Sequence, residues 1–408
     1  MDPVFFLHIP KTAGTSLRLW LKQAMPEVRS SDLDSDLRCV ADDELAARAL
    51  VSGHFGIATL ERLKRLSPKG RVVTFLRRPA DHLASSFEHS NAIYRGMTTP
   101  ELETLAPQDR EVADWIRSGR EPPSFADALA FSARRSPEWL NASQMRYLIL
   151  SASDPDQADR PIAPVQLSLD MRDEAFGRLA GFAAFGLVES MARSIAIICD
   201  ALGWPWCGET ARLNVGKPSD SIEEARKVPQ PDDEALYALA LDLFEQRWAD
   251  LCARMGADPA APDQGLAGVI AGLDARALET LSTDRMGWTG VEDGLFARGL
   301  GERFFYEPEG RWLRNVTGDL TLFAPCPADA RRLSLCFGYI LPDPEKTVLT
   351  LNGMATPFVT RYEQEPGGAW RIWLDADLPG DRKNAVAATV SGATDVQMQG
   401  SFLGFAIA

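Results

Sequence analysis

The sequence is poor in the residues that build metal sites and disulfide frameworks. Its 408 residues include six cysteines and four histidines, and they show neither CxxC spacing nor an HExxH pair. We therefore expect no bound metal, and thiols that stay reduced, as is typical of a cytoplasmic protein. The four histidines are His8, His54, His82 and His89.

Long apolar runs and an excess of positive charge are also missing. No apolar stretch reaches the roughly 18 residues of a membrane-spanning helix, and the first residues lack the basic and apolar regions of a secretion signal. The formal charge of -14 argues against general affinity for nucleic acid or anionic membranes. We expect a cytoplasmic protein with no transmembrane segment and no nucleic-acid partner, in which any bound polyanion occupies a local basic pocket.

The length exceeds the roughly 250–300 residues at which one hydrophobic core stops growing, so two domains are expected. Up to about Met255, short apolar runs alternate with helical patterns, which predicts an α/β domain with a central parallel sheet. Beyond Trp288, short strand-like runs separated by Gly, Pro and Asp predict an all-β sandwich or jelly roll. The predicted parts are an α/β domain at 1–258, a linker with a connecting helix at 259–288, and a β-sandwich at 289–408.

Several elements have clear local signals. Val4–Ile9 and Arg71–Leu76 are predicted to be buried strands, and each precedes a Pro-containing loop and an amphipathic helix. In the β-rich region, Asn352-Gly353 between two apolar runs predicts a two-residue hairpin turn.

The loop after the first predicted strand has the composition of an anion site. Backbone N–H groups and the positive end of a helix converge on phosphate oxygens in such loops. Lys11 adds a mobile charge, and Gly14 permits close approach. No glycine precedes Lys11, so the Walker A pattern of ATPases and GTPases is not met. A simple strand-to-helix turn is the alternative. The loop consists of Pro10, Lys11, Thr12, Ala13, Gly14, Thr15 and Ser16.

A second charged group stands at the end of the next long apolar strand. Arg77 can form a forked contact with a phosphate, and Ser85, on the helix that follows, can return to the same pocket.

These motifs resemble those of the carbohydrate sulfotransferases that use 3′-phosphoadenosine-5′-phosphosulfate (PAPS). The likeness is greatest to the branch with heparan sulfate 2-O- and 6-O-sulfotransferases and their bacterial relatives. Ile9–Ser16 is similar to the family's 5′-phosphosulfate loop, and Leu76-Arg77-Arg78-Pro79 with Ser85 is similar to its 3′-phosphate motif. Arg78 stands where the family commonly has an acidic residue. Val51–Gly56 is similar to the segment that carries the family's catalytic histidine, here His54.

The resemblance continues along most of the predicted α/β domain. Residues 141–148, with Asn141, Gln144 and Arg146, are similar to an Asn-x-x-Gln-x-Arg-x-Leu motif, which implies contacts with the acceptor. Residues 185–194 are similar to a late strand-and-helix element, and 213–218 to a loop over the nucleotide, with Asn214 and Lys217 as contacts.

The family likeness implies transfer of a sulfuryl group from PAPS to a hydroxyl, leaving adenosine 3′,5′-bisphosphate, without a metal. Lys11 would stabilise the leaving phosphate, and His54 would be the general base. Arg77 and Ser85 would select the 3′-phosphate. His54 taken alone has a structural role as its alternative, and His89 either lines the acceptor cleft or lies solvated at the surface.

The last hundred residues resemble the β-sandwich modules of bacterial polysaccharide glycosyltransferases, which implies a saccharide or glycolipid acceptor. Four aromatic residues there either stack on sugars or fill the core: Tyr306, Trp312, Trp370 and Trp373. Two other functions stay open, a P-loop kinase-like phosphotransferase and a non-catalytic nucleotide-binding protein on the same fold.

Overall fold

The structure is a computed structural model that describes most of the chain, in two compact units. The described residues are 2–24, 30–32, 40–105, 107–119, 121–135, 144–149, 167–208, 220–280, 287–290, 296–306, 311–326, 329–338, 347–364, 370–380, 385–391 and 400–407. One unit comprises Met1–Leu17, Ser31–Ile198 and Ala211–Trp248, and the other comprises Arg18–Ser30, Cys199–Thr210 and Ala249–Ala408.

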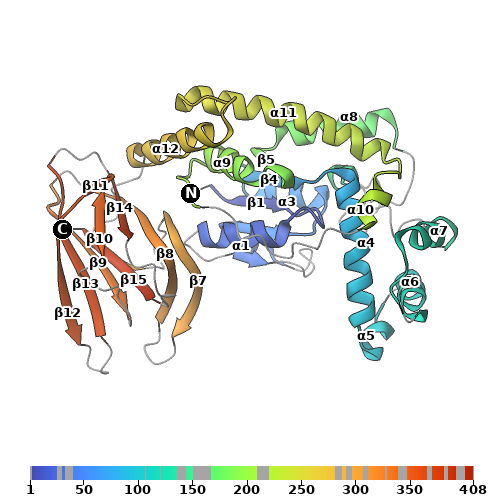
Figure 1. The fold of residues 1–408 in the computed structure, drawn as a ribbon, viewed down its shortest axis with the longest axis horizontal. Coiled ribbons are helices and arrows are strands. Elements are labelled where there is room, and N and C mark those ends of the chain that lie inside the picture. The colour runs from blue at the N-terminus through green and yellow to red at the C-terminus, as the bar shows by residue number, and fades with distance from the viewer. Residues whose placement is uncertain are drawn as a thin grey trace. The chain divides into compact units, whose positions relative to one another are not determined.

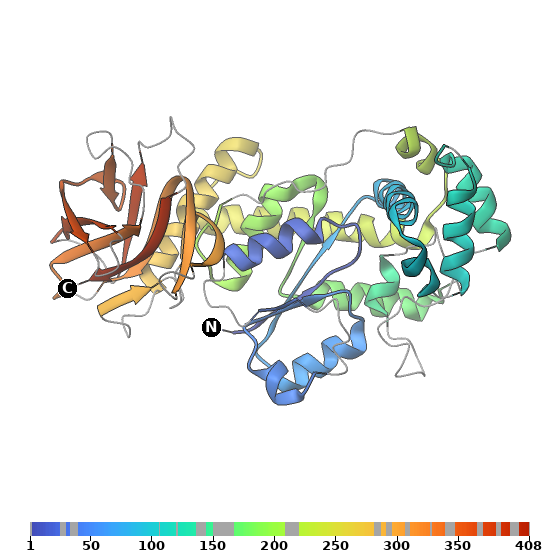
Figure 2. The same cartoon turned by 90° about the horizontal axis from the view of Figure 1, so that it is seen from below.

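The first unit is built on a parallel sheet. Strands β1 (Val4–Leu7), β3 (Leu50–Gly53), β4 (Arg71–Leu76) and β5 (Ala184–Leu187) pair in parallel, and the sheet order is β2-β3-β1-β4-β5, with β2 at Ser30–Asp32. Parallel neighbours need long crossovers, and helices flank this sheet (Figures 1 and 2). Nearly every residue of the four strands is buried, as expected for a sheet covered on both faces. The predicted parallel α/β sheet is confirmed.

Helices connect or follow these strands, and the last helix along the chain belongs to the second unit. Their bounds are α1 Gly14–Ala24, α2 Asp42–Ala46, α3 Ile57–Leu66, α4 Pro79–Gly96, α5 Thr99–Glu103, α6 Pro107–Ser118, α7 Phe125–Arg135, α8 Leu169–Gly181, α9 Met191–Leu202, α10 Asp220–Ala225, α11 Pro231–Met255 and α12 Pro262–Thr280. Among the described helices, none is both long and apolar enough to cross a membrane.

Helix α4 follows the end of β4 and carries two of the predicted site residues, Ser85 and His89. It begins at Pro79, whose missing N–H costs nothing in the first turn. Leu83, Ala84 and Phe87 form its buried apolar side and pack with residues of α7. Ser85, two residues after Leu83, therefore lies on the other side of the helix.

The C-terminal strands form an antiparallel sheet, ordered β11-β10-β14-β8-β15-β9-β13-β12, with β6 beside β15 and β7 beside β8. Their bounds are β6 Gly287–Gly290, β7 Phe296–Tyr306, β8 Arg311–Pro325, β9 Arg332–Gly338, β10 Val348–Leu351, β11 Met354–Ala355, β12 Phe358–Gln364, β13 Trp370–Asp377, β14 Ala385–Ser391 and β15 Gly400–Ile407. The predicted hairpin is confirmed, because Leu351 pairs with Met354 across Asn352 and Gly353, which both have positive φ.

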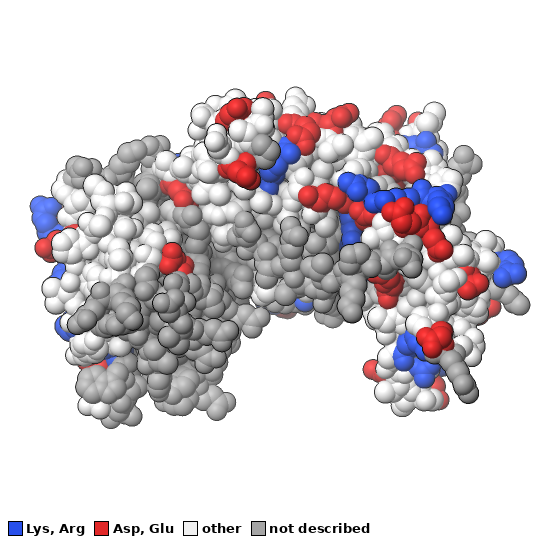
Figure 3. Space-filling model, in the orientation of Figure 1, with Lys and Arg blue, Asp and Glu red and all other residues white. Residues whose placement is uncertain are grey.

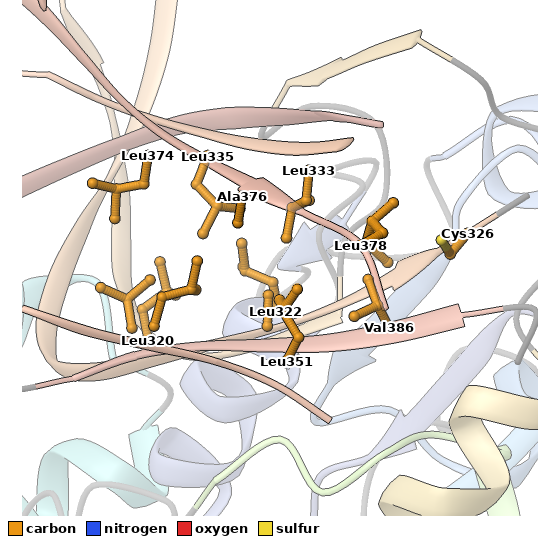
Figure 4. Close-up of a cluster of buried hydrophobic side chains, with 14 of the residues drawn as sticks. Leu320, Leu322, Cys326, Leu333, Leu335, Leu351, Leu374, Ala376, Leu378 and Val386 are labelled. Atoms are coloured by element: carbon orange, nitrogen blue, oxygen red, sulfur yellow. The ribbon is translucent and has the colours of Figure 1, made fainter. Parts of the chain in front are cut away.

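The β-rich region has its own apolar core (Figure 4). Residues two apart along a strand share a face, so Leu320 and Leu322 of β8 enter the core together. Side chains of β9 and β13 face those of β8, β10 and β14 across it (Figure 4). Trp373 lies outside this cluster and is half-buried, with Arg361 4.7 Å above its ring. The side chains of Tyr306, Trp312 and Trp370 lie outside the described part of the chain.

Candidate functional site

The loops that carry the predicted chemistry meet at one edge of the parallel sheet. Strand β1 lies between β3 and β4, and all three run in the same direction. The chain passes from β1 to β3 on one side and then crosses to β4 on the other. Such a reversal of strand order opens a crevice at the carboxyl ends of the strands. His54 after β3, Lys11 after β1 and Arg77 after β4 all follow strands that end there.

The loop between β1 and α1 has an unusual backbone conformation. Lys11 and Ala13 have φ angles of 65° and 61°, in the left-handed region that non-glycine residues rarely adopt. Each such residue costs on the order of 1–3 kcal/mol unless its surroundings impose the conformation. Left-handed residues alternating with others turn successive N–H groups toward one point, where an anion binds.

Side chains hold this loop by its carbonyl groups. Thr12 Oγ1 donates to Ile9 O over 2.7 Å, His82 Nε2 bonds Pro10 O over 2.8 Å, and Arg77 Nη1 donates to Lys11 O over 3.2 Å. A trans peptide points its N–H away from its C=O, and no cis bond is present among the described residues. The N–H groups of Lys11 and Thr12 therefore face away from the anchored carbonyls, which makes them available to an anion.

The corner after β4 is fixed in a similar way. Gln144, just before the short 3₁₀ helix Met145–Leu148, is 1% exposed. Its amide accepts from Arg77 N and donates to Arg77 O, both over 2.8 Å. Arg78 N donates to Glu189 Oε1 over 2.7 Å. Asp233, near the start of α11, accepts from Gln144 N over 2.9 Å. Arg77 is thereby held with its guanidinium beside the loop.

His54 follows β3 on the other side of β1. Its Nδ1 lies 3.0 Å from His8 O. A carbonyl only accepts, so this hydrogen bond requires a proton on Nδ1, and Nε2 takes no part in it. The imidazole is exposed, and its ring centroid lies 4.1 Å from that of His8. His54 is therefore placed with Nδ1 bound to a backbone carbonyl and with Nε2 as its other ring nitrogen.

The charges around Lys11 show which groups lie near it. Burial, and then the nearby Arg77, lower the pKa of Lys11, while Glu88 opposes this. Partial burial, followed by Lys11 and His54, lowers the pKa of His89. An anion bound between Lys11 and Arg77 would relieve their repulsion.

One face of the molecule carries side chains of both charges (Figure 3). On the face shown in Figure 3, the described Lys and Arg side chains are interspersed with Asp and Glu over the helices. Among the described residues, no group of three His, Cys, Asp or Glu side chains is placed to hold a metal ion.

The remaining predicted site residues are placed as follows. Thr12 and Ser16 are buried, and Thr15 is exposed at the start of α1. Ser85 is half-buried on α4, one turn before His89. Arg146 is buried, and burial lowers its pKa against the opposing effect of Asp232 and Asp233. Asn141, Asn214 and Lys217 lie outside the described residues, and the acceptor contacts of Gln144 and Arg146 stay predictions.

The sequence analysis did not identify the residues that support the site through hydrogen bonds and packing. His82 anchors Pro10 O, Glu189 anchors Arg78, and Asp233 anchors Gln144. His8 packs on His54. The position of His82 on the helix after Arg77 was a signal that it lies near the strand ends, but nothing local indicated which way its ring points.

Comparison with known proteins adds little. No protein-family model and no curated protein matches this chain. A solved structure with some similarity is that of a sulfotransferase from Alicyclobacillus acidocaldarius, which is 15% identical, has a TM-score of 0.28, and is matched over 64% of this chain and 99% of that chain. Because both the identity and the TM-score are low, function has to be inferred from the residues of the site.

Proposed function

We propose that this protein is a sulfotransferase that uses PAPS as donor and a hydroxyl of a saccharide or glycolipid as acceptor. One observation carries the proposal: the carbonyls of Pro10 and Lys11 are each held by a side chain, which leaves the N–H groups of Lys11 and Thr12 facing away from those side chains. The imidazole of His54, with Nδ1 bound to His8 O, follows the neighbouring strand. An anion cradle and a base at the ends of adjacent strands suit in-line transfer of a charged group to a hydroxyl.

The donor side of the proposed site has two tasks. The loop N–H groups and Lys11 hold the 5′-phosphosulfate and stabilise the charge that grows on the leaving phosphate. Arg77 and Ser85 bind the 3′-phosphate, as the family resemblance implies. Arg77 uses one N–H on Lys11 O, and a guanidinium has five N–H donors, so it can hold the loop and contact an anion together.

The acceptor side depends on His54. Its Nε2 takes the proton from the acceptor hydroxyl while that oxygen forms a bond to sulfur. The bond from sulfur to the bridging phosphate oxygen breaks at the same time, and adenosine 3′,5′-bisphosphate leaves. His89, whose pKa responds to both Lys11 and His54, lies where the acceptor would approach. The saccharide class of the acceptor rests on the family resemblance.

Calorimetry with two nucleotides tests the donor assignment. We expect adenosine 3′,5′-bisphosphate to bind at least about tenfold more tightly than AMP, because AMP leaves Arg77 and Ser85 without the 3′-phosphate. Ser85→Ala should reduce the difference in affinity between the two nucleotides. Lys69→Ala, at an exposed loop position before β4, is the matched control and should leave that difference unchanged. Equal affinity of the wild-type protein for the two nucleotides would contradict the proposal.

A transfer assay tests the reaction itself. Radiolabelled PAPS is offered with a panel of saccharides and glycolipids, and label in the acceptor is measured. Transfer that needs no added ATP supports a sulfotransferase and excludes a kinase. Selective binding of the bisphosphate without transfer to any acceptor would favour a non-catalytic nucleotide-binding protein.

A further inference from the structure

His8, the residue that follows β1, has an imidazole packed on three sides. Its side chain lies on the same face of the chain as Phe6, and the two rings stack with centroids 5.4 Å apart. On another side the ring meets that of His54, with centroids 4.1 Å apart and planes inclined by 31°. On a third side it touches Gly14, because a Cβ at Gly14 would lie 1.6 Å from His8 Nε2. His8 is 9% exposed.

Both the backbone and the side chain of His8 contact the same partner. His8 O accepts the proton on His54 Nδ1 over 3.0 Å, and the His8 ring supports the His54 ring from one face. His54 is itself exposed, and an exposed imidazole otherwise samples several rotamers. The hydrogen bond selects the nitrogen that carries the proton, and the His8 ring holds the imidazole of His54 in the orientation in which that bond forms.

The packing also links His54 to the anion loop. Gly14 is the first residue of α1, at the end of the loop that contains Lys11 and Ala13. Because the His8 ring fills the space above Gly14, a change in the loop would move the ring, and a change in the ring would move His54. The two proposed ends of the transfer are therefore in mechanical contact through one side chain.

We propose that His8 is a positioning residue, whose imidazole, between Gly14 and His54, orients the basic Nε2 of His54 and sets its position relative to the anion loop. The catalytic meaning of this assignment rests on the proposed function, whereas the orientation is a property of the protein alone. His8 is not the base itself. Its Nε2 faces the backbone of Gly14, and the ring is buried, so an acceptor hydroxyl does not reach it.

The first test needs no substrate. It uses a single variant, which serves to assign the NMR signals of His54. Long-range ¹H–¹⁵N NMR spectra of the imidazoles, assigned with His54→Gln, report the tautomer of each histidine near neutral pH. We expect His54 to be protonated on Nδ1 and to show nuclear Overhauser contacts with the His8 ring. A His54 protonated mainly on Nε2, or the absence of contacts between the two rings, overturns the proposal even if the protein transfers sulfate.

The second test compares two replacements of His8. His8→Ala removes the ring, whereas His8→Phe keeps a flat ring between Gly14 and His54 but cannot titrate. We expect His8→Ala to give His54 a mixture of tautomers and to slow single-turnover transfer on the order of tenfold or more. Affinity for adenosine 3′,5′-bisphosphate should change less than about twofold. His8→Phe should restore the tautomer and most of the rate.

The outcomes separate this inference from the proposed function. If His8→Ala leaves both the tautomer of His54 and the transfer rate as in the wild-type protein, His8 does not position His54. If His8→Ala yields no soluble protein, or gives no NMR signal for His54, the His8→Phe variant and the wild-type NMR spectra still decide whether His8 positions His54. If no acceptor is ever sulfated, the proposed function fails, but the tautomer and its dependence on the His8 ring remain measurable.

Discussion

The carboxyl edge of the parallel sheet and the core of the β-rich region bury different kinds of side chain. The described buried polar residues near the sheet edge include His8, Thr12, Ser16, Thr74, His82, Gln144, Arg146 and Asp233. The cluster in Figure 4 is apolar throughout, and the buried polar residues in the described part of that region are Thr347 and Asp375. Polar burial is therefore concentrated where the proposed chemistry is.

The difference has a physical reason. A buried polar group destabilises a protein unless it is hydrogen-bonded, so a fold retains one where the bond has a purpose. At the sheet edge, Thr12, His82 and Gln144 each bond the backbone of a loop. In the β-rich core, the buried side chains of the cluster contribute to stability through apolar area and close packing. Substitutions in the two regions should consequently fail in different ways, one losing activity and the other losing stability.

The largest effect is expected at His54. His54→Ala should lower turnover on the order of 10²–10⁴-fold, as is usual for a lost general base. Affinity for adenosine 3′,5′-bisphosphate should be nearly unchanged, because the proposed mechanism assigns His54 to the acceptor. Lys11→Ala should instead lower both turnover and affinity, since the proposed mechanism has its charge contact the donor before transfer. Single-turnover transfer and calorimetry separate the two. Wild-type rates in His54→Ala would make His89 the next candidate for the base.

The converse effect is expected in the β-rich core. Leu374 is 0% exposed in the cluster of Figure 4, and Leu374→Ala should lower the free energy of unfolding by about 2–5 kcal/mol. Nucleotide affinity should stay unchanged. Val359, on β12 and 64% exposed, provides the control, because Val359→Ala should change stability by less than about 0.5 kcal/mol. Urea unfolding gives the stability. If Leu374→Ala lowered nucleotide affinity at a temperature where the protein stays folded, the expected separation between effects on stability and effects on binding would be wrong.

A smaller effect is expected at Gln144. Gln144→Ala removes both bonds to the backbone of Arg77, which should weaken bisphosphate binding by about 1–3 kcal/mol. Gln144→Glu keeps the acceptor but not the donor and should fall between alanine and wild type. Gln364, exposed at the end of β12, is the matched control. If bisphosphate affinity were the same in Gln144→Ala and Gln364→Ala, the backbone of Arg77 would not need this support.

The smallest effect is a dependence of stability on pH through His82. Burial lowers the pKa of His82, Arg77 and Lys11 act in the same direction, and Asp233 and the bond to Pro10 O oppose them. Below about pH 6.5, His82 therefore binds a proton in the unfolded chain more readily than in the folded protein. Stability should be complete above that pH and fall below it, by at most about 1.4 kcal/mol per pH unit.

Urea midpoints measured at pH 7.5 and at pH 5.5 check this expectation. The difference between the two should be smaller in His82→Gln, whose amide still donates to Pro10 O but does not titrate. An equal difference in the variant would assign the pH dependence to another group.

Local pattern was enough to predict the parts of the site that lie next to strand ends. Arg71–Leu76 was predicted with its observed bounds, and the Lys11 loop and Arg77 follow their strands as expected. The carboxyl ends of parallel strands meet at one edge whatever the details of packing, so these residues were bound to approach one another.

What the sequence could not show depends on distant partners. Gln144 bonds Arg77 across 67 positions of the chain, and Asp233 bonds Gln144 across 89. Such pairs form only when the helices and strands have packed together, and the pattern of apolar residues along the sequence does not indicate them. Helix α4 shows a milder limit: the pattern predicted Pro79–Glu88, but the helix continues to Gly96, because its later turns pack against α6.

The contact between His8 and Gly14 also sets a rule for reading other sequences. A methyl group at position 14 and an imidazole at position 8 cannot occupy the same space. A chain that keeps both this loop and this position of the ring therefore needs glycine at position 14. The residues at positions 8 and 14 are expected to change together. An aligned sequence with a ring at the first position and a larger residue at the second has a different loop, a different ring position or an error in its alignment.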